Sequence, residues 1–491
     1  MKIAIIGISY AGIACALRVR AELPETEIIM YDKGATNVHN DENLLRYLAT
    51  DNQEYLKEGH SSSDEELLDL NITLKRNVSV RNVEPTTKTI TYLDYQTNER
   101  IEEKYDKLVV ATGHYPVLPQ IKTDYPERVF SLNSVLEAER LGALLPKAKN
   151  ISIIGGGLLA FRLAMMLSIK GFNINVFDES DYILDDIFSL EHGRLLKGVF
   201  EVLNINLRPE KVTNFYKGNR SFFIDTDKEN KVPCDLIILA GEYRPNSFLM
   251  MKTLKTGYLG AIVVDKYLHT SDPDILAAGD CAVIVLDDNS NIRGATIGSA
   301  KRQGELAALN ILEKKRAFPT TQKMISMMES PLFLGTVGLT QKEAIQKGIE
   351  CETIFVLNHL KYLDNKENEP TGVWEHWFDG ANSEYNDSTL IEHNHQKILE
   401  YLGGYYAGLL YEKSTYKILG MQIIGNVHSI QETLNYFSLA IEYGRTIKDL
   451  EYIDGIPDLR FKNTRPLAKI FADAILKRLE KRGERDERHN W

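Results

Sequence analysis

The feature that most constrains this chain is a glycine-rich turn that occurs twice, about 150 residues apart. The first copy follows the apolar run 2–6 and reads Gly7-x-Ser9-x-x-Gly12. The second follows the run 150–154 and reads Gly155-x-Gly157-x-x-Ala160. Small residues at these positions let the backbone approach a pyrophosphate at the N-terminus of the following helix. The repeat therefore predicts an α/β protein with two Rossmann-like dinucleotide-binding domains.

An acidic residue ends the strand predicted after each turn. These acids are Asp32, twenty residues beyond Gly12, and Asp178, which closes the run Val-Phe-Asp. An acid at this place accepts hydrogen bonds from the ribose hydroxyls of an adenosine. No Lys or Arg occurs in the next three residues after Asp178, so the sequence favours NADH over NADPH. For a single copy of the turn, a tight bend with no ligand is the simple alternative.

Length and composition limit the class of protein. A chain of 491 residues predicts about three domains. The formal net charge of −11 argues against nucleic acid or an anionic membrane as a partner. No apolar run is long enough to cross a bilayer. Four widely spaced cysteines fit neither a disulfide framework nor a zinc site, and together these features predict a cytoplasmic protein. We expect no metal site, since the His-x-His pair at 393 and 395 lacks a third convergent ligand.

Three further strand–turn segments follow in a fixed order: KLVVATGHYP at 107–116, DLIILAGEYRPN at 235–246 and ILAAGDC at 275–281. With the two glycine turns they resemble the pyridine nucleotide–disulfide oxidoreductase superfamily. The closest resemblance is to its NADH peroxidase, NADH oxidase and coenzyme A-disulfide reductase branch. It covers nearly the whole chain, including AKRQG at 300–304 and the C-terminal stretches 336–340 and 416–422.

The resemblance implies bound FAD, the substrate NAD(H) and three domains. Residues 1–117 and 246–317 would form a discontinuous FAD-binding domain, and residues 118–245 the NAD-binding domain. Residues 318–491 would form an α+β C-terminal domain that builds a homodimer. The FAD site would contain Gly7, Ser9, Gly12, Asp32, Lys33, Val80, Thr112, Gly113, Gly279 and Asp280. The NAD site would contain Gly155, Gly157, Leu158, Ala160, Asp178 and Gly241.

The chain departs from the family at its redox centre. Relatives place one redox cysteine shortly after the first ribose acid, where this chain has Glu42 or a neighbour and no cysteine. Peroxidases of the branch have a histidine in the first glycine turn, where this chain has Tyr10. An aromatic residue and a glutamate near the nicotinamide are replaced by Leu158 and Arg162.

Without a relay thiol, three functions remain open. The first is an NADH oxidase that reduces oxygen directly to hydrogen peroxide. The second is an NADH-dependent reductase of a quinone, electron carrier or other organic acceptor, with Tyr10 or Glu42 as the catalytic proton donor. The third is a flavoprotein that senses NADH or redox state without turnover.

Two expectations concern the C-terminal part of the chain. An apparent insertion within 358–402 predicts either a surface elaboration or a lid over a partner's active site. The apolar stretches 404–411 and 418–424 need a covering surface, and the family uses a partner subunit for this. We therefore expect a homodimer built on residues after about 318.

Overall fold

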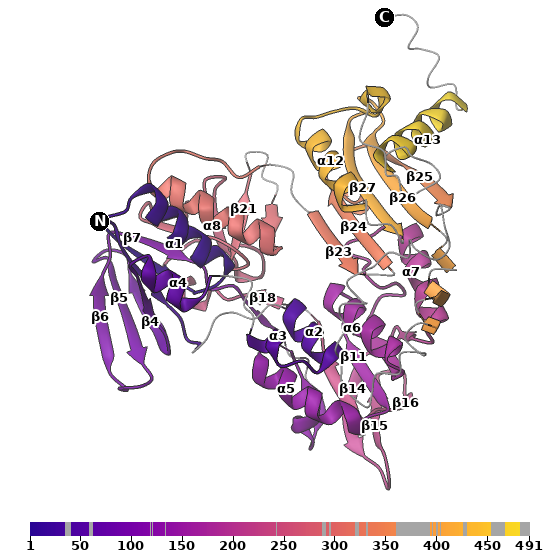
Figure 1. Ribbon diagram of the computed structural model, residues 1–491, viewed down its shortest axis with the longest axis horizontal. Helices are drawn as coiled ribbons and strands as arrows, with labels where there is room; N and C mark the ends of the chain where they lie inside the picture. The colour runs from indigo at the N-terminus through magenta and orange to yellow at the C-terminus, as the bar shows by residue number, and fades with distance from the viewer. Residues whose placement is uncertain are drawn as a thin grey trace, which may run out of the picture.

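A computed structural model shows three lobes; the one that contains the N-terminus lies at the left of Figure 1, and the other two lie at the right. The structure describes residues 1–34, 41–57, 62–117, 119, 121–132, 134–241, 243–286, 291–293, 296–319, 324–329, 332–359, 393–394, 396–398, 401–402, 404–425, 430–452 and 467–481.

The first lobe is built on a parallel sheet of order β20-β7-β1-β2-β3. Its strands are β1 (Lys2–Ile6), β2 (Glu27–Tyr31), β3 (Ile72–Lys75), β7 (Lys107–Val110) and β20 (Ile275–Ala277). Almost all residues of the central strands are buried, as expected for a parallel sheet covered on both faces. The strand order reverses between β1 and β7, which is where sheets of this kind bind ligands.

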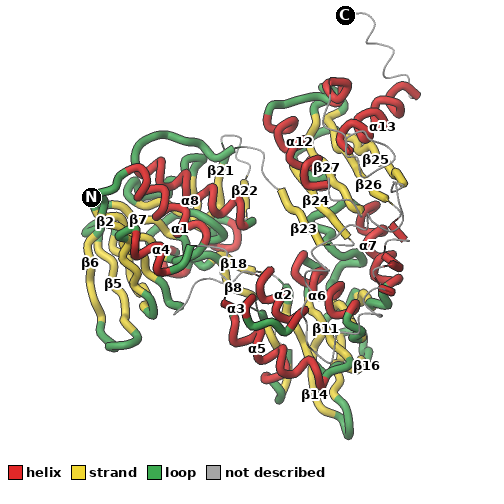
Figure 2. The backbone as a smooth tube through the Cα atoms, in the orientation of Figure 1, coloured by secondary structure: helices red, strands yellow, loops and turns green. Residues whose placement is uncertain are grey.

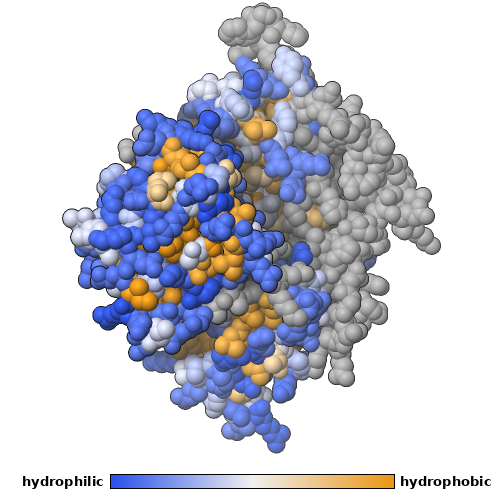
Figure 3. Space-filling view, turned by 60° about the vertical axis from the view of Figure 1, so that its left-hand side comes forward, coloured by the Kyte–Doolittle hydropathy of each residue, from blue (hydrophilic) through white to orange (hydrophobic). Residues whose placement is uncertain are grey.

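Helices and smaller sheets surround this core. The helices are α1 (Tyr10–Glu22), α4 (Asp64–Asp69) and α8 (Ile297–Ile311), and α1 packs against α8. One antiparallel sheet contains β4 (Val78–Glu84), β5 (Thr89–Asp94) and β6 (Arg100–Lys104). Another sheet contains β19 (Ile262–Val264), β21 (Ala282–Val285) and β22 (Asn291–Arg293). A space-filling view shows hydrophobic residues gathered in patches between hydrophilic ones on this lobe (Figure 3).

The second lobe repeats the parallel architecture with the order β10-β17-β11-β12-β13. Its strands are β10 (Val129–Phe130), β11 (Asn150–Ile154), β12 (Asn173–Phe177), β13 (Asn206–Arg208) and β17 (Leu236–Leu239). Its helices are α5 (Val135–Leu144), α6 (Leu158–Ile169) and α7 (Leu190–Val202). A smaller sheet contains β9 (Lys122–Thr123), β14 (Val212–Lys217), β15 (Phe222–Thr226) and β16 (Lys231–Pro233).

The third lobe is an antiparallel sheet of order β23-β24-β27-β26-β25 with helices against it. Its strands are β23 (Met324–Glu329), β24 (Leu332–Gly338), β25 (Cys351–His359), β26 (Gly404–Glu412) and β27 (Ile418–Gly425). Its helical elements are α9 (Gln341–Gln346), α12 (Ile430–Glu442), η5 (Ile447–Tyr452) and α13 (Leu467–Lys481).

The structure corrects one argument for the homodimer. Strands β26 and β27 contain the apolar stretches 404–411 and 418–424, and nearly all their residues are buried within this single chain. Helix α12 packs on β24 and β27, and the second lobe adds to the cover through Ser189, whose backbone N–H bonds the Gln422 side chain at 2.9 Å. These strands therefore need no partner subunit to cover them.

Two short helices lie in an unexpected place. Helices α2 (Asp41–Thr50) and α3 (Glu54–Lys57) fall within the first nucleotide-binding segment of the sequence. In the structure, α2 contacts α5 and α6 of the second lobe, and its buried leucines belong to that lobe's core (Figure 2). The Lys170 ammonium at the end of α6 donates to the carbonyls of Leu48 and Ala49 at 3.1 and 2.8 Å. These contacts attach α2 to the second lobe.

The first and second lobes are joined by a two-stranded pairing of β8 (His114–Pro116) with β18 (Tyr243–Pro245). Among the described residues, no helix is both long enough and apolar enough to span a membrane.

Candidate dinucleotide sites

The first glycine turn connects β1 to α1, and its two glycine positions have no space for a side chain. Gly7 has φ +110°, and a Cβ atom there would lie 2.1 Å from the Ala111 carbonyl oxygen. A Cβ atom at Gly12 would lie 2.1 Å from the Gly7 carbonyl oxygen. Helix α1 starts after Ser9 with no side-chain cap and no acid in its first turn. Its N-terminal N–H groups and positive dipole end are therefore suited to a pyrophosphate.

Asp32 follows β2 and faces the same turn. Its Oδ2 accepts a hydrogen bond from the Ile8 backbone N–H at 2.8 Å, and its Oδ1 accepts one from Gly34 at 2.7 Å. The two bonds fix the carboxylate at the turn, where a ribose diol attached to the pyrophosphate would lie. The neighbouring Lys33 is exposed, and Val80 on β4 packs against the core of the lobe.

The segments after β7 and β20 both approach the first glycine turn and contact each other. The Thr112 hydroxyl donates to the Asn246 carbonyl at 2.5 Å, and the Asn246 backbone N–H donates to the Gly113 carbonyl at 2.9 Å. Asp280 Oδ2 lies 2.9 Å from His114 Nδ1, so the aspartate predicted to bind FAD is held in place by a histidine. Sequence reasoning missed His114, although it directly follows the Ala-Thr-Gly turn.

Helix α8 also contributes to this region. The Gly279 backbone N–H donates to the Gln303 side-chain oxygen at 2.7 Å, which ties the Gly-Asp turn to α8. A Cβ atom at Gly304 would lie 2.0 Å from the Ala11 carbonyl oxygen, so α8 and α1 pack with almost no separation. The sequence motif AKRQG predicted the helix, and the structure adds the role of Gln303 in positioning Gly279.

The second glycine turn has the same design in the second lobe. Gly155 has φ +125°, and a Cβ atom there would lie 2.4 Å from the Ala240 carbonyl oxygen. Around Gly157, the N-cap of α6, no described atom would lie within 4 Å of an added Cβ. This open space adjoins an uncapped helix N-terminus, as a bound pyrophosphate requires. Ala160 is buried in α6, and Gly241 follows β17 near the turn.

Asp178 directly follows β12, beside this turn. Its Oδ1 accepts a hydrogen bond from the Ser180 backbone N–H at 2.9 Å, and its Oδ2 would lie 2.5 Å from a Cβ at Gly156. Burial is the largest effect that raises the pKa of Asp178, and the nearby acids Asp185, Glu179 and Asp186 raise it further. This acidic surrounding favours a ribose diol and disfavours a 2′-phosphate.

The two residues that depart from the family near the nicotinamide both lie on α6. Leu158 is the first residue of the helix and is partly buried against the core of the second lobe. Arg162 stands one turn later, where the branch has a glutamate, and it is also partly buried. This chain thus has a positive charge where the branch has a negative one, which changes the electrostatic field at the predicted nicotinamide position.

The two residues predicted to be catalytic lie on different lobes. Tyr10 is the first residue of α1, and the Lys301 ammonium lies 5.6 Å from the centre of its ring. Glu42 lies in the first turn of α2, which packs against the second lobe, and its side chain is outside the described residues.

All four cysteines lie in described parts of the chain and all are free thiols. Burial raises the pKa of Cys15 and of Cys234 to about 12, and it also raises the pKa of Cys281 and Cys351. Cys15 and Cys281 are fully buried and pack in the core of the first lobe. A raised pKa leaves little nucleophilic thiolate near neutral pH.

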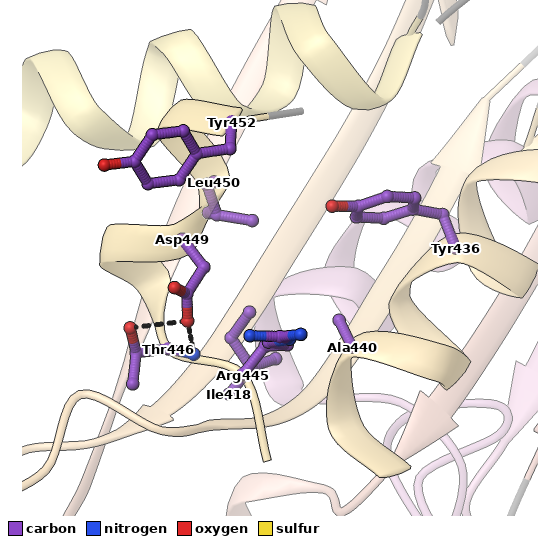
Figure 4. A pocket seen from close by; sticks show the side chains of 8 residues that line it. All are labelled: Ile418, Tyr436, Ala440, Arg445, Thr446, Asp449, Leu450 and Tyr452. Carbon is purple, nitrogen blue, oxygen red and sulfur yellow. Dashed lines mark hydrogen bonds between the residues drawn. The ribbon is translucent and has the colours of Figure 1, made fainter. Parts of the chain in front are cut away.

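A hollow of about 370 Å³ lies in the third lobe, away from both glycine turns. Figure 4 shows it between α12 and η5, with the Tyr436 ring on one side and the Tyr452 ring on the other. The Asp449 carboxylate on its wall accepts hydrogen bonds from the Thr446 backbone and hydroxyl at 2.7 and 3.0 Å. The hollow is therefore not part of either dinucleotide site.

Several predictions concern residues outside the described part of the chain. These are most of the insertion at 358–402, the His395 position of the His-x-His pair and the side chain of Glu42. Across the residues that are described, no group of three or more His, Cys, Asp or Glu side chains is arranged to hold a metal ion.

Comparison with known proteins gives a consistent result. Residues 1–307 match the family described as pyridine nucleotide-disulphide oxidoreductase. The chain is 26% identical over 488 residues to an NADH oxidase from Enterococcus faecalis, covering 98% of this chain and 100% of that protein. It is 31% identical over 259 residues to a nitric oxide reductase FlRd-NAD(+) reductase from an Enterobacter species, covering 51% of this chain and 64% of the relative.

Among solved structures, the chain is similar to a water-forming NADH oxidase from Lactobacillus brevis bound to NADH. The TM-score is 0.82, and the match covers 98% of this chain and 99% of that one at 24% identity. At this identity the likeness shows the fold, and the mixed α/β arrangement with several parallel sheets agrees with it.

Proposed function

The chain belongs to the pyridine nucleotide-disulphide oxidoreductase family and is an NAD(H) oxidoreductase, and we propose that it oxidises NADH through FAD and reduces oxygen directly to hydrogen peroxide. Bound FAD would supply the redox chemistry, since it takes up a hydride equivalent from NADH and passes two electrons to the acceptor. The protein's part is to hold the two dinucleotides, to choose between NADH and NADPH, and to determine what happens to the peroxide.

The first lobe carries the groups proposed to hold FAD. The open N-terminus of α1 would bind the pyrophosphate, and Asp32 would accept hydrogen bonds from the adenosine ribose. Asp280 would accept a hydrogen bond from a ribityl hydroxyl, and His114 keeps its carboxylate in place at 2.9 Å. The second lobe would hold NADH by the same means, with Gly157 at the pyrophosphate and Asp178 at the ribose.

The state of the cysteines is the observation that carries the proposal for the product. Relatives with a redox thiol can reduce peroxide further through a cysteine sulfenic acid. Here the position after the first ribose acid is occupied by the start of α2, with Asp41 and Glu42, and a carboxylate does not cycle between oxidation states. The four cysteines elsewhere have raised pKa values. Peroxide should therefore leave the protein unreduced.

A thiol test examines this proposal directly. Cys351 is the one cysteine of the four that is not fully buried, so it is the main target of an alkylating reagent under native conditions. We expect iodoacetamide treatment and the Cys351→Ser variant each to leave NADH turnover in air unchanged. Loss of turnover after alkylation in both the wild type and Cys351→Ser would show that a buried thiol takes part, and would contradict the proposal.

Tyr10 is the described candidate for the proton donor to the reduced acceptor. Its position at the start of α1 places it beside the proposed FAD pyrophosphate end of the helix, and Lys301 supplies a positive charge beside its ring. The Tyr10→Phe variant keeps the ring and removes the hydroxyl. We expect it to lower kcat with oxygen and leave FAD content unchanged.

The third lobe offers a surface for the proposed homodimer. Large side chains are exposed on α12 and η5, and the exposed fractions are 39% for Tyr436, 61% for Leu439, 74% for Tyr443 just past the end of α12, and 83% for Tyr452 at the end of η5. The first three recur at helical spacing, so they form a continuous stripe. We propose that a second copy of this chain covers the stripe, in place of the buried strands that the sequence suggested.

A second candidate function is reduction of a protein electron carrier. It is favoured by the partial relative named FlRd-NAD(+) reductase, with 31% identity. Anaerobic stopped-flow mixing with NADH tests both functions against a non-turnover sensor, because only a sensor would show very slow loss of flavin colour or none.

A further inference from the structure

Helix α2 comes from the first nucleotide-binding segment of the sequence but packs into the second lobe, beside α5 and α6 (Figure 1). Five of its residues are buried in the hydrophobic core of that lobe; they are Leu44, Leu45, Tyr47, Leu48 and Ala49. Tyr47 lies so close to α5 that a Cβ atom at Gly142 would be 2.8 Å from the Tyr47 hydroxyl oxygen. The apolar face of α2 is therefore committed to the lobe that contains the second glycine turn.

The C-terminal end of α2 is held by the ammonium group of Lys170. A helix leaves its last four carbonyl groups without partners inside the helix. The Asp51 backbone N–H donates to the Tyr47 carbonyl at 2.7 Å. Lys170 Nζ donates to the carbonyls of Leu48 and Ala49 at 3.1 and 2.8 Å. Lys170 thus satisfies two of these carbonyls, and its charge faces the negative end of the helix dipole.

Lys170 has no carboxylate partner that would explain its position. It is partly buried and forms no ion pair with a described residue. Burial is the largest cause of its pKa being lowered to about 8, and the carboxylate of Asp51 acts in the opposite direction. Such an ammonium group is costly to bury unless its hydrogen bonds are made. Within the described part of the chain these bonds go to α2, so the residue is placed to hold that helix.

Helix α6 connects this contact to the second glycine turn. Its N-cap is Gly157, where the NADH pyrophosphate is proposed to bind, and its C-cap is Lys170. The same end of α6 is fixed from the third lobe, because the buried Asn394 side chain donates to the Ile169 carbonyl at 3.4 Å. A helix of 12 residues is about 18 Å long. One rigid element therefore joins the proposed NADH site to the end of α2.

The first turn of α2 stands at the position of the missing redox centre. Asp41 and Glu42 begin the helix where relatives of the family place the redox cysteine. The helix has 10 residues, so fixing its apolar face and its C-terminal end also fixes this first turn. The segment at the redox position is therefore attached to the second lobe.

We infer that Lys170 is a positioning residue for the oxidation of NADH, because it fixes α2, and with it the segment at the redox position, to the helix that binds NADH. The inference rests on the proposed function and extends it to a residue at the opposite end of α6 from the glycine turn. Lys170 contacts neither proposed dinucleotide site. Its loss should leave both sites intact and release α2.

Hydrogen exchange of the α2 amides, followed by mass spectrometry of the FAD-loaded protein without NADH, tests whether Lys170 holds the helix. Lys170→Met keeps an unbranched side chain and removes the donors, so exchange in α2 should become about tenfold faster while α5 keeps its protection. Lys197→Met removes an exposed cation of α7 and is the matched control, which should exchange as the wild type does. Gly142→Ala presses on Tyr47 from α5 and should also speed exchange in α2.

The pH dependence separates this role from simple packing. The pKa of Lys170 is about 8 with α2 in place and about 10.4 for a lysine in water, so the charged form favours release. A neutral amine still has two N–H groups for the two carbonyls. Between pH 7.5 and 9.5 the protection factors of α2, corrected for intrinsic exchange, should therefore rise about tenfold or more in the wild type. They should stay constant in Lys170→Met, which has no group that titrates there.

Turnover in air gives the functional result. Lys170→Met should keep its FAD and lower kcat for NADH oxidation about tenfold, with little change in KM for NADH, because the proposed binding groups are untouched. Unchanged exchange in α2 of Lys170→Met, or an equal change in Lys197→Met, would overturn the inference. A released α2 with unchanged kcat would also overturn it. A wild type whose flavin is not reduced by NADH would refute the proposed function instead, and the exchange results do not depend on that reaction.

Discussion

His192 lies at the junction between the second and third lobes and should make the protein sensitive to acid. The residue is fully buried in α7, and its Nδ1 lies 2.8 Å from the Ser189 hydroxyl. The rings of Phe188, Phe355 and Tyr406 surround it, with centroids 5.0 to 5.8 Å away. Its Nε2 has no hydrogen-bond partner among the described residues. The site is therefore built for a neutral imidazole.

Burial is the largest cause of the pKa of His192 being lowered to about 3, and the backbone of Gln422 acts in the opposite direction. An unfolded histidine has a pKa of about 6.5, so between pH 6.5 and 3 the unfolded state binds a proton that the folded state excludes. The stability is therefore complete above about pH 6.5 and falls as the pH decreases through this range. The linkage relation gives a loss of about 2 kcal/mol between pH 7.5 and pH 5 from this one group.

The assay is urea unfolding of the wild type and of His192→Asn at pH 7.5 and pH 5. Asparagine can keep a hydrogen bond to Ser189 and does not titrate, so we expect its loss of stability on acidification to be about 2 kcal/mol smaller. His269→Asn, at a histidine of the first lobe, is the control and should behave as the wild type. Equal pH dependence in His192→Asn and the wild type would refute the reasoning.

Three further predictions concern the cofactors and the assembly. Asp280→Ala should weaken FAD retention by about 1.5–3 kcal/mol, since a ribityl hydroxyl would lose a charge-assisted partner; equilibrium dialysis measures this, and unchanged affinity counts against the site. Asp178→Ser should reduce the preference of kcat/KM for NADH over NADPH about tenfold or more, and a wild type with no such preference would contradict the assignment. Leu439→Glu should convert a dimer to a monomer in light scattering, whereas a wild type that is already monomeric at micromolar concentration removes the proposed interface.

Much of the fold follows from local patterns in the sequence. The apolar runs 2–6 and 150–154 are strands with the same bounds in the structure, because an apolar run beside a glycine turn is a strong local signal. The positions of Asp32 and Asp178 at the ends of their strands follow from the same pattern. Both carboxylates lie beside their glycine turns as expected, but their individual hydrogen-bond partners could not be predicted.

Contacts between distant segments were not predictable from local patterns. The apolar face of α2 is visible in the sequence, but periodicity does not show whether the first or the second lobe covers it. The bond between His114 and Asp280 joins residues 166 positions apart. For the same reason the sequence assigned β26 and β27 to a partner subunit, whereas this chain buries them itself.

Oxygen uptake tests the central claim most directly. The claim is that NADH is oxidised and that oxygen is reduced to hydrogen peroxide without a cysteine relay. The FAD-loaded protein is mixed with a limiting amount of NADH in an oxygen-electrode cell, and catalase is added when uptake stops. The account predicts one oxygen consumed per NADH, half of which catalase returns. If catalase returns no oxygen and one oxygen is consumed for every two NADH, the product is water and the account is wrong.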